Sequence, residues 1–181
     1  YLVRVYNGTD GGGSEWGNAW SDATGATAFY LVEGDYGYLV EKNAARSAKA
    51  GFTVARSADQ TLTYTLAKLT INVGRAGYLV RVYNGTDGSA AEWGNAWSDA
   101  TGATAFYLVE GDYGYLVEKN AARSAKAGFT VVRSTDQTLT YTLAKLTINV
   151  GDNAGAGRAG YLVRVYNGTG GGGAEWGNAW S

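Results

Sequence analysis

Proline, cysteine, methionine and histidine are all absent from this chain of 181 residues. A chain of average composition would contain about nine prolines, so this lack is a marked bias. Without histidine and cysteine, the common zinc sites, cysteine nucleophiles and serine–histidine–acid triads are excluded, and disulfide bonds cannot form. No apolar run reaches the roughly 18 residues of a membrane-spanning helix, so we expect no membrane insertion in this segment.

Charge of either sign is nearly balanced, with 15 Lys and Arg against 16 Asp and Glu, for a net charge of −1. This balance argues against a nucleic-acid partner, which would favour a basic surface. Instead, the chain is rich in glycine (28 residues) and tyrosine (14 residues). We therefore expect a protein that is not an enzyme and uses no cofactor.

An internal repeat dominates the sequence. The run Tyr-Leu-Val-Arg-Val-Tyr-Asn-Gly-Thr begins at Tyr1, Tyr78 and Tyr161, and the third copy reaches only Ser181. A unit of 77 residues exceeds the roughly 20–50 residues of solenoid repeats and suits a small autonomous β-domain. Residues 1–74 and 78–151 differ at only five paired positions: Gly12/Ser89, Gly13/Ala90, Ser14/Ala91, Ala55/Val132 and Ala58/Thr135.

Apolar residues within one unit recur with a period of two, which predicts β-strands. Leu69 and Ile71 share one face of such a strand, and Val80 and Val82 share one face of the next. Turn formers such as Asn-Gly separate the runs. Only residues 121–127 have helical propensity, which predicts one or two helical turns or a loop. The predicted strands cover residues 68–73, 78–83, 103–109, 112–117 and 138–143.

Residues 98–113 read Ser-Asp-Ala-Thr-Gly-Ala-Thr-Ala-Phe-Tyr-Leu-Val-Glu-Gly-Asp-Tyr. This run resembles the TDxxGxaxFxLxxGxY signature of bacterial and archaeal immunoglobulin-like surface repeats, namely the prealbumin-like and Cna protein B-type (carboxypeptidase regulatory-like) domains. Residues 128–131 and 136–143 resemble the closing strands of those domains, and residues 145–150 resemble the opening strand of the next copy. The resemblance implies an all-β fold of tandem immunoglobulin-like (prealbumin-like) β-sandwich repeats of about 77 residues.

The resemblance also sets the expected domain boundaries. Residues 1–66 would be a repeat that lacks its first strand, 67–143 a complete repeat, and 144–181 the opening strands of a third. Because an incomplete sandwich exposes a sheet edge and apolar side chains, we expect head-to-tail β-strand complementation. The donor would be an adjacent repeat of a longer array or another copy of the chain.

The most distinctive motif is Glu-Trp-Gly-Asn-Ala-Trp, which occurs three times. On a regular strand its two indoles and its amide would share one face and form a candidate platform for sugar rings. The alternative is that the indoles pack in the sandwich core or in an interdomain seam. The candidate platform residues are Trp16, Asn18, Trp20, Trp93, Asn95, Trp97, Trp176, Asn178 and Trp180.

Asn7, Asn84 and Asn167 each begin an Asn-Gly-Thr sequon, so they are candidate glycosylation sites. Asn-Gly is equally a favoured hairpin dipeptide. Isolated turn aspartates lack the ligand density of a calcium site, and we expect no metal. The nearby carboxylates Glu110 and Asp112 fall in a predicted turn, where a solvated position is favoured over catalysis.

Several domains of the resembling families carry an internal Lys–Asn or Lys–Asp isopeptide bond, promoted by a buried glutamate. Lys68 and Lys145 lie on opening strands, and Glu33 or Glu110 would be the acid. The final strand offers no Asn or Asp, and this departure from the pattern counts against the bond.

These observations favour a structural, non-catalytic repeat region of an extracellular surface filament or adhesin stalk. Near-identical copies suit a spacer, in which length matters more than distinct sites. The alternative is a carbohydrate-binding repeat module that uses the paired tryptophans, with avidity from repetition. A consensus-derived sequence is a third interpretation of so restricted a composition.

Overall fold

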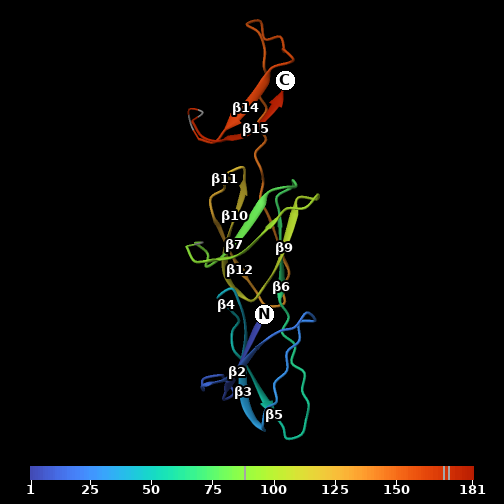
Figure 1. The fold of residues 1–181 in the computed structure, drawn as a ribbon, viewed down its shortest axis with the longest axis vertical. Helices are drawn as coiled ribbons and strands as arrows, with labels where there is room; N and C mark the ends of the chain where they lie inside the picture. Colours follow the sequence, from blue (N-terminus) through green and yellow to red (C-terminus); the bar gives the residue numbers. More distant parts are fainter. Residues whose placement is uncertain (88, 169, 171) are drawn as a thin grey trace.

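The computed structural model describes residues 1–87, 89–168, 170 and 172–181, and it is elongated (Figure 1). The regular elements among these residues are all strands. The described residues accordingly include no helix that could cross a membrane. The fold is therefore all-β, as expected. The strands are β1 (Leu2–Asn7), β2 (Glu15–Trp20), β3 (Gly34–Lys42), β4 (Ala45–Arg46), β5 (Ala50–Val54), β6 (Ala67–Asn72), β7 (Leu79–Asn84), β8 (Glu92–Trp97), β9 (Ala103–Leu108), β10 (Gly111–Lys119), β11 (Ala122–Arg123), β12 (Ala127–Val131), β13 (Gln137–Thr140), β14 (Leu162–Tyr166) and β15 (Glu175–Trp180).

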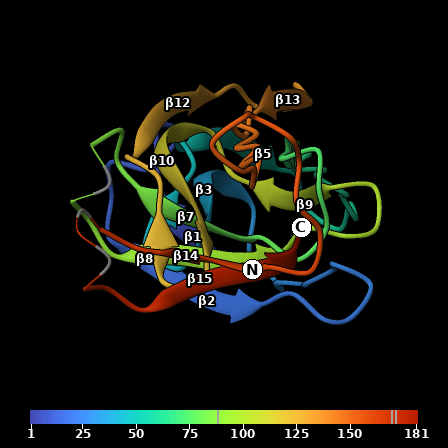
Figure 2. The ribbon, with the colours of Figure 1, turned by 90° about the horizontal axis from the view of Figure 1, so that it is seen from above.

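Two five-stranded antiparallel sheets have the same order. The first runs β2-β1-β3-β4 with β5 also paired to β3, and the second runs β8-β7-β10-β11 with β12 also paired to β10. A third copy of the opening hairpin, β14–β15, forms a two-stranded sheet. These three assemblies follow one another along the long axis of the molecule (Figure 1) and overlap when it is seen from above (Figure 2).

In the middle part of the chain, a three-stranded sheet faces the five-stranded sheet that contains β7 and β10. The two sheets together form a β-sandwich. Strand β6 lies at the centre of this sheet, antiparallel to β9 and parallel to β13. The expected inward faces are confirmed, because alternate residues of β6, β7, β9 and β10 are buried together between the sheets. This core consists of Ala67, Leu69, Ile71, Val73, Tyr78, Val80, Val82, Trp93, Phe106, Leu108, Tyr113, Tyr115, Val117 and Val131.

Identical sequences adopt different structures in different copies. Residues 103–108 form β9 against β6, whereas the same six amino acids at residues 26–31 form no strand. The closing sequence behaves in the same way, since it forms β13 at residues 137–140 and no strand at residues 60–63. The reason is the shared partner: both β9 and β13 pair with β6, and no described strand occupies the corresponding place beside residues 26–31.

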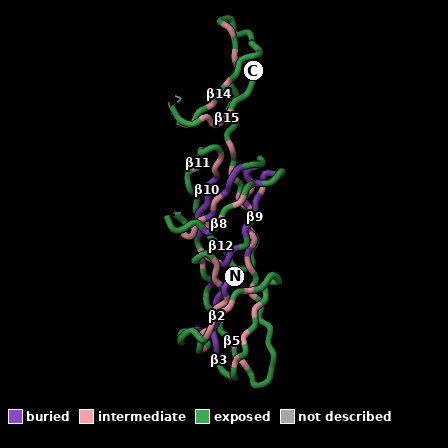
Figure 3. The backbone as a smooth tube through the Cα atoms, viewed as in Figure 1, coloured by how far each residue is buried: buried purple, intermediate pink, exposed green. Residues whose placement is uncertain are grey.

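Burial follows the same contrast (Figure 3). Val109, after β9, is 1% exposed, whereas its counterpart Val32 is 74% exposed. The opening-strand sequence itself is buried where it is paired and exposed where it is unpaired, since Leu69 is 1% exposed and Leu146 is 70% exposed. A strand of this sequence is therefore needed to bury the apolar side chains of one unit.

Of the two alternatives for residues 121–127, helical turns are not found; the segment contains the short strand β11 and a connection to β12. Asn120 and Ala121, both at positive φ, form a two-residue turn between β10 and β11. The Ser124 hydroxyl then accepts a hydrogen bond from the Val117 amide at 3.0 Å, which holds the returning chain beside β10. Tertiary pairing overrides a weak local helical preference here.

Candidate functional site

The tryptophan motif forms the second strand of each copy and contains a β-bulge. In the pairing of β7 with β8 the register shifts: Val82 lies opposite Gly94, and the next residue, Tyr83, lies opposite Glu92. Trp93 is therefore an extra residue on β8. The bulge turns the Trp93 side chain into the core, where it is 7% exposed and contacts Phe106 edge-to-face at 6.2 Å. Trp97 lies opposite Leu79 and is 63% exposed.

The expectation that Trp93, Asn95 and Trp97 share one face is therefore wrong. Asn95 lies opposite Arg81, on the outer face with Trp97, while Trp93 lies on the inner face. A bulge inserts one residue and so reverses the alternation on which the expectation depended. The structure brings together an exposed indole and an amide, and it does not bring together two indoles.

The other two copies vary this arrangement. Trp20 and Trp180 are exposed, like Trp97. Trp16 contacts Phe29 at 6.3 Å but is itself exposed, and Trp176 is half-buried. In all three copies the asparagine amide donates a hydrogen bond to the glutamate of its own motif; the donor–acceptor pairs are Asn18–Glu15, Asn95–Glu92 and Asn178–Glu175.

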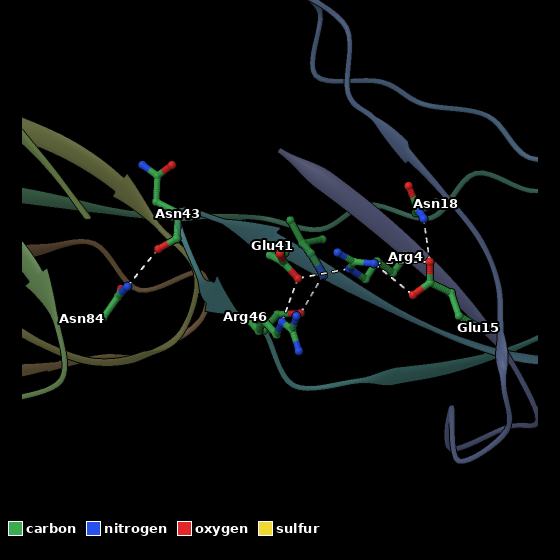
Figure 4. A network of polar contacts seen from close by, with 9 residues as sticks. Arg4, Glu15, Asn18, Glu41, Asn43, Arg46 and Asn84 are labelled. Atoms are coloured by element: carbon green, nitrogen blue, oxygen red, sulfur yellow. Dashed lines mark hydrogen bonds and ion pairs between the residues drawn. The ribbon is translucent and has the colours of Figure 1, made fainter. Parts of the chain in front are cut away.

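These glutamates belong to an ion-pair ladder across the outer face. Arg4 pairs with Glu15 at 3.0 Å and with Glu41 at 3.1 Å, and Glu41 also pairs with Arg46 at 2.7 Å (Figure 4). Hydrogen bonds from Asn18 and Arg4 lower the pKa of the Glu15 carboxyl. The ladder therefore links β2, β1, β3 and β4 across the sheet, and each of its carboxylates has a guanidinium or amide partner.

The second copy repeats this ladder with Arg81 at its centre. Arg81 pairs with Glu92 at 2.9 Å and with Glu118 at 3.1 Å, and Glu118 pairs with Arg123 at 2.9 Å. Desolvation raises the pKa of Glu92, but hydrogen bonds from Asn95 and Arg81 outweigh it and lower the pKa overall.

The three sequon asparagines differ in their surroundings. Asn7 is exposed, and its amide donates to the Ser14 hydroxyl at 3.2 Å. Asn84 and Asn167 are half-buried, and each donates to a backbone carbonyl of the preceding unit, that of Asn43 and that of Asn120. Thr169 of the third sequon lies outside the described residues.

The contacts between residues 1–66 and residues 67–143, called the first junction below, include several residues that were not singled out from the sequence. Lys42 places its ammonium group 5.4 Å from the centre of the Trp93 ring. The Glu110 carboxylate accepts a 2.7 Å hydrogen bond from the Ala48 amide and a second from the Tyr64 hydroxyl. The Tyr1 hydroxyl donates to the Tyr107 carbonyl, which lies in β9 of the next unit. Glu110, proposed above as an isopeptide acid, is therefore a junction residue.

The carboxylates of the described part of the chain are dispersed over turns, strands and the junction. No group of three or more potential ligands is placed to hold a metal there. Asp112 accepts a 2.7 Å hydrogen bond from Thr130 and thereby supports the β10–β12 pairing. A groove of about 1000 Å³ lies between the second unit and the β14–β15 hairpin, and Leu146, Ile148 and Trp180 line it.

No protein-family model and no curated protein matches the chain. Among solved structures, that of the Bacillus anthracis TIE protein is similar to this chain, with a TM-score of 0.37 and 16% sequence identity over 78% of the chain. The match covers 29% of the TIE protein chain, so the present chain spans less than a third of that protein. A likeness of this degree carries no argument about function.

Proposed function

We propose that this chain is part of a non-catalytic repeat region of an extracellular surface filament or adhesin stalk. Its units would be tandem immunoglobulin-like, prealbumin-like β-sandwiches of about 77 residues, with boundaries near residues 66 and 143. The observation that carries the proposal is the repeated junction, in which the same side chains of successive copies meet in the same way. Identical junctions stack similar units along one direction and build length.

Small-angle X-ray scattering tests this proposal. A compact globule of this length would have a radius of gyration of about 16 Å. A stiff array gives a clearly larger radius and a scattering profile typical of a rod. A radius close to that of a globule would overturn the proposal.

The partner proposed for this array is a further copy of the same unit. Residues 26–31 and 60–63 lack the strand that their counterparts pair with, and Leu146 and Ile148 are exposed on a segment of the matching sequence. A neighbouring repeat, in the same polypeptide or in another molecule, would supply that strand. The contact joins two different surfaces, so between molecules it grows head to tail without closing.

Sedimentation at increasing concentration distinguishes the two sources of the strand. Assembly of the chain that Ile148→Asp abolishes supports donation between molecules, and Thr147→Asp on the opposite face of the segment is the matched control. A monomeric chain indicates that only a covalently linked neighbour donates. Strand donation of either kind is contradicted if a longer array also leaves residues 26–31 unprotected from hydrogen exchange.

The second candidate is carbohydrate binding, favoured by the exposure of Trp20, Trp97 and Trp180 on the outer face. An exposed indole stacks on the apolar face of a sugar ring, and a neighbouring amide can orient it. Glycan-array binding that Trp97→Ala removes without loss of β-structure would support this function. Unchanged binding, or no binding by the parent chain, would leave the stalk as the better proposal.

A further inference from the structure

The tip of the β3–β4 hairpin reaches into the next unit. Asn43 and Ala44 form its two-residue turn, with φ values of 50° and 65°. The Asn43 amide donates to the Trp93 carbonyl. The Asn43 carbonyl accepts a 2.8 Å hydrogen bond from the Asn84 amide (Figure 4). One residue of the turn thus both donates to and accepts from the next unit.

The second junction repeats this exchange residue by residue. The Asn120 amide donates to the Trp176 carbonyl, and the Asn120 carbonyl accepts a 2.9 Å hydrogen bond from the Asn167 amide. The donor and acceptor lie 50 residues apart at the first junction and 56 apart at the second. Because the connections differ in length, the linker does not impose the contact, and its recurrence reflects recognition between the two surfaces.

Asn7 shows what the same asparagine does without a preceding turn. It is exposed, and its amide bonds locally to Ser14. The positions equivalent to Ser14 are Ala91 and Ala174, which have no hydroxyl to compete for the amide. At the first junction the Asn84 amide is enclosed, because its Oδ1 atom is buried and makes no hydrogen bond within the described part of the chain.

We infer that the sequon asparagine is the docking residue for the Asn-Ala turn of the preceding unit, and that docking and N-glycosylation of this side chain exclude each other. Glycosylation joins Nδ2 to the sugar C1 atom, breaks the bond from C1 to the departing diphosphate, and releases one amide proton. The attached sugar would then occupy the space that the turn fills. The inference rests on junction geometry and holds whatever role the array plays.

Asn7 and Asn84 form a matched pair, because each stands in the same sequence Tyr-Asn-Gly-Thr-Asp. The folded chain is treated with UDP-glucose and a purified transferase that glucosylates Asn-x-Thr sites, and the peptides are quantified by mass spectrometry. We expect Asn84 to react about 10-fold more slowly than Asn7, since reaction must await opening of the junction. Urea-unfolded chain supplies the reference, in which the two rates become equal. Equal rates in the folded chain would overturn the inference.

A second measurement follows the junction directly. The chain has no cysteine, so spin labels at Ala23→Cys and Ala100→Cys, equivalent exposed positions in two units, report one distance distribution. We expect Asn84→Ala to broaden this distribution and Asn7→Ala to leave it unchanged. If Asn84→Ala loses β-structure by circular dichroism, Asn43→Gly, which a turn at positive φ tolerates, carries the same test. A narrow, unshifted distribution in the folded variant would contradict a docking role.

Discussion

Gly25 and Gly102 occupy the same Asp-Ala-Thr-Gly turn in two copies, with φ values of +86° and +84°. A Cβ atom at Gly102 would lie 2.3 Å from the backbone nitrogen of Arg75, whereas at Gly25 it would meet nothing within 4 Å. Both alanine variants incur the left-handed backbone strain of about 1–2 kcal/mol. We expect Gly102→Ala to lose about 2 kcal/mol more than Gly25→Ala, because backbone must also move. Urea unfolding measures both losses, and equal losses would contradict the packing.

The two tryptophans of β8 allow a second comparison between single residues. Trp93 is part of the core, so Trp93→Ala should lower the free energy of unfolding by about 3–5 kcal/mol. Trp97 is exposed on the outer face, so Trp97→Ala should change it by no more than about 0.5 kcal/mol. Denaturant titration followed by far-UV circular dichroism gives both values. A large loss for Trp97→Ala would show that its indole is packed against a surface.

Strands in this chain depend on their partners as much as on their own residues. The six residues Ala-Thr-Ala-Phe-Tyr-Leu occur at residues 26–31 and 103–108 with the same β-branched and aromatic side chains. They form a strand only at residues 103–108, where they pair with β6. Each of the inward side chains Leu69, Ile71 and Val73 contributes very roughly 1.5–3 kcal/mol when buried. That contribution stabilises β9 and β13 together, so all three strands form or are lost as one element.

A peptide with the sequence of residues 67–73 should therefore act on the first copy. Added in excess, it is expected to pair with residues 26–31 and protect their amides from hydrogen exchange. Val32 and Leu31 would become buried, as their counterparts Val109 and Leu108 are. The same peptide carrying Ile71→Asp provides the control and should give no protection. Absence of protection with the parent peptide would argue against an open strand site in this copy.

The sequence predicted the inward-facing residues of the middle unit correctly. It misplaced a side chain of the tryptophan motif, which was its leading candidate site. Alternation placed Leu69, Ile71, Val80 and Val82 on inward faces, because a buried face leaves a period-two pattern. Alternation also misplaced Trp93, since a bulge shifts the pattern. The signal that could have indicated the bulge is Gly94, an isolated glycine in the strand directly after the extra residue. The sequence did not indicate the junction, because its main contacts come from the turn residue Asn43. Asn43 is followed by Ala44, and the recognisable signal for such a turn is Asn-Gly.

At the scale of the whole molecule, the first junction has contacts beyond the asparagine exchange. The Tyr64 hydroxyl donates to Glu110, and the Arg133 guanidinium lies 4.3 Å from the centre of the Tyr64 ring. Burial, followed by the hydrogen bond to Glu110, raises the pKa of Tyr64 well above its ordinary value. Burial alone raises the pKa of Tyr1 to about 12. The Tyr1 hydroxyl donates to the Tyr107 carbonyl, so both contacts require a protonated phenol. Tyr64 thereby binds the closing segment of the first unit to the next unit, and Tyr1 binds the start of its opening strand.

Alkaline pH should therefore loosen the first junction. A phenol whose pKa is higher in the docked state stabilises docking fully below its undocked pKa of about 10, and this stability is lost as pH rises through the docked value. With labels at Ala23→Cys and Ala100→Cys, the distance distribution should broaden between about pH 10 and 12. Tyr64→Phe removes one donor, so it should broaden the distribution already near neutral pH and reduce the further alkaline change. Broadening that coincides with loss of the β-sheet circular dichroism would instead show that the sheets themselves fail, because a junction held by these phenols opens while the strands are still paired.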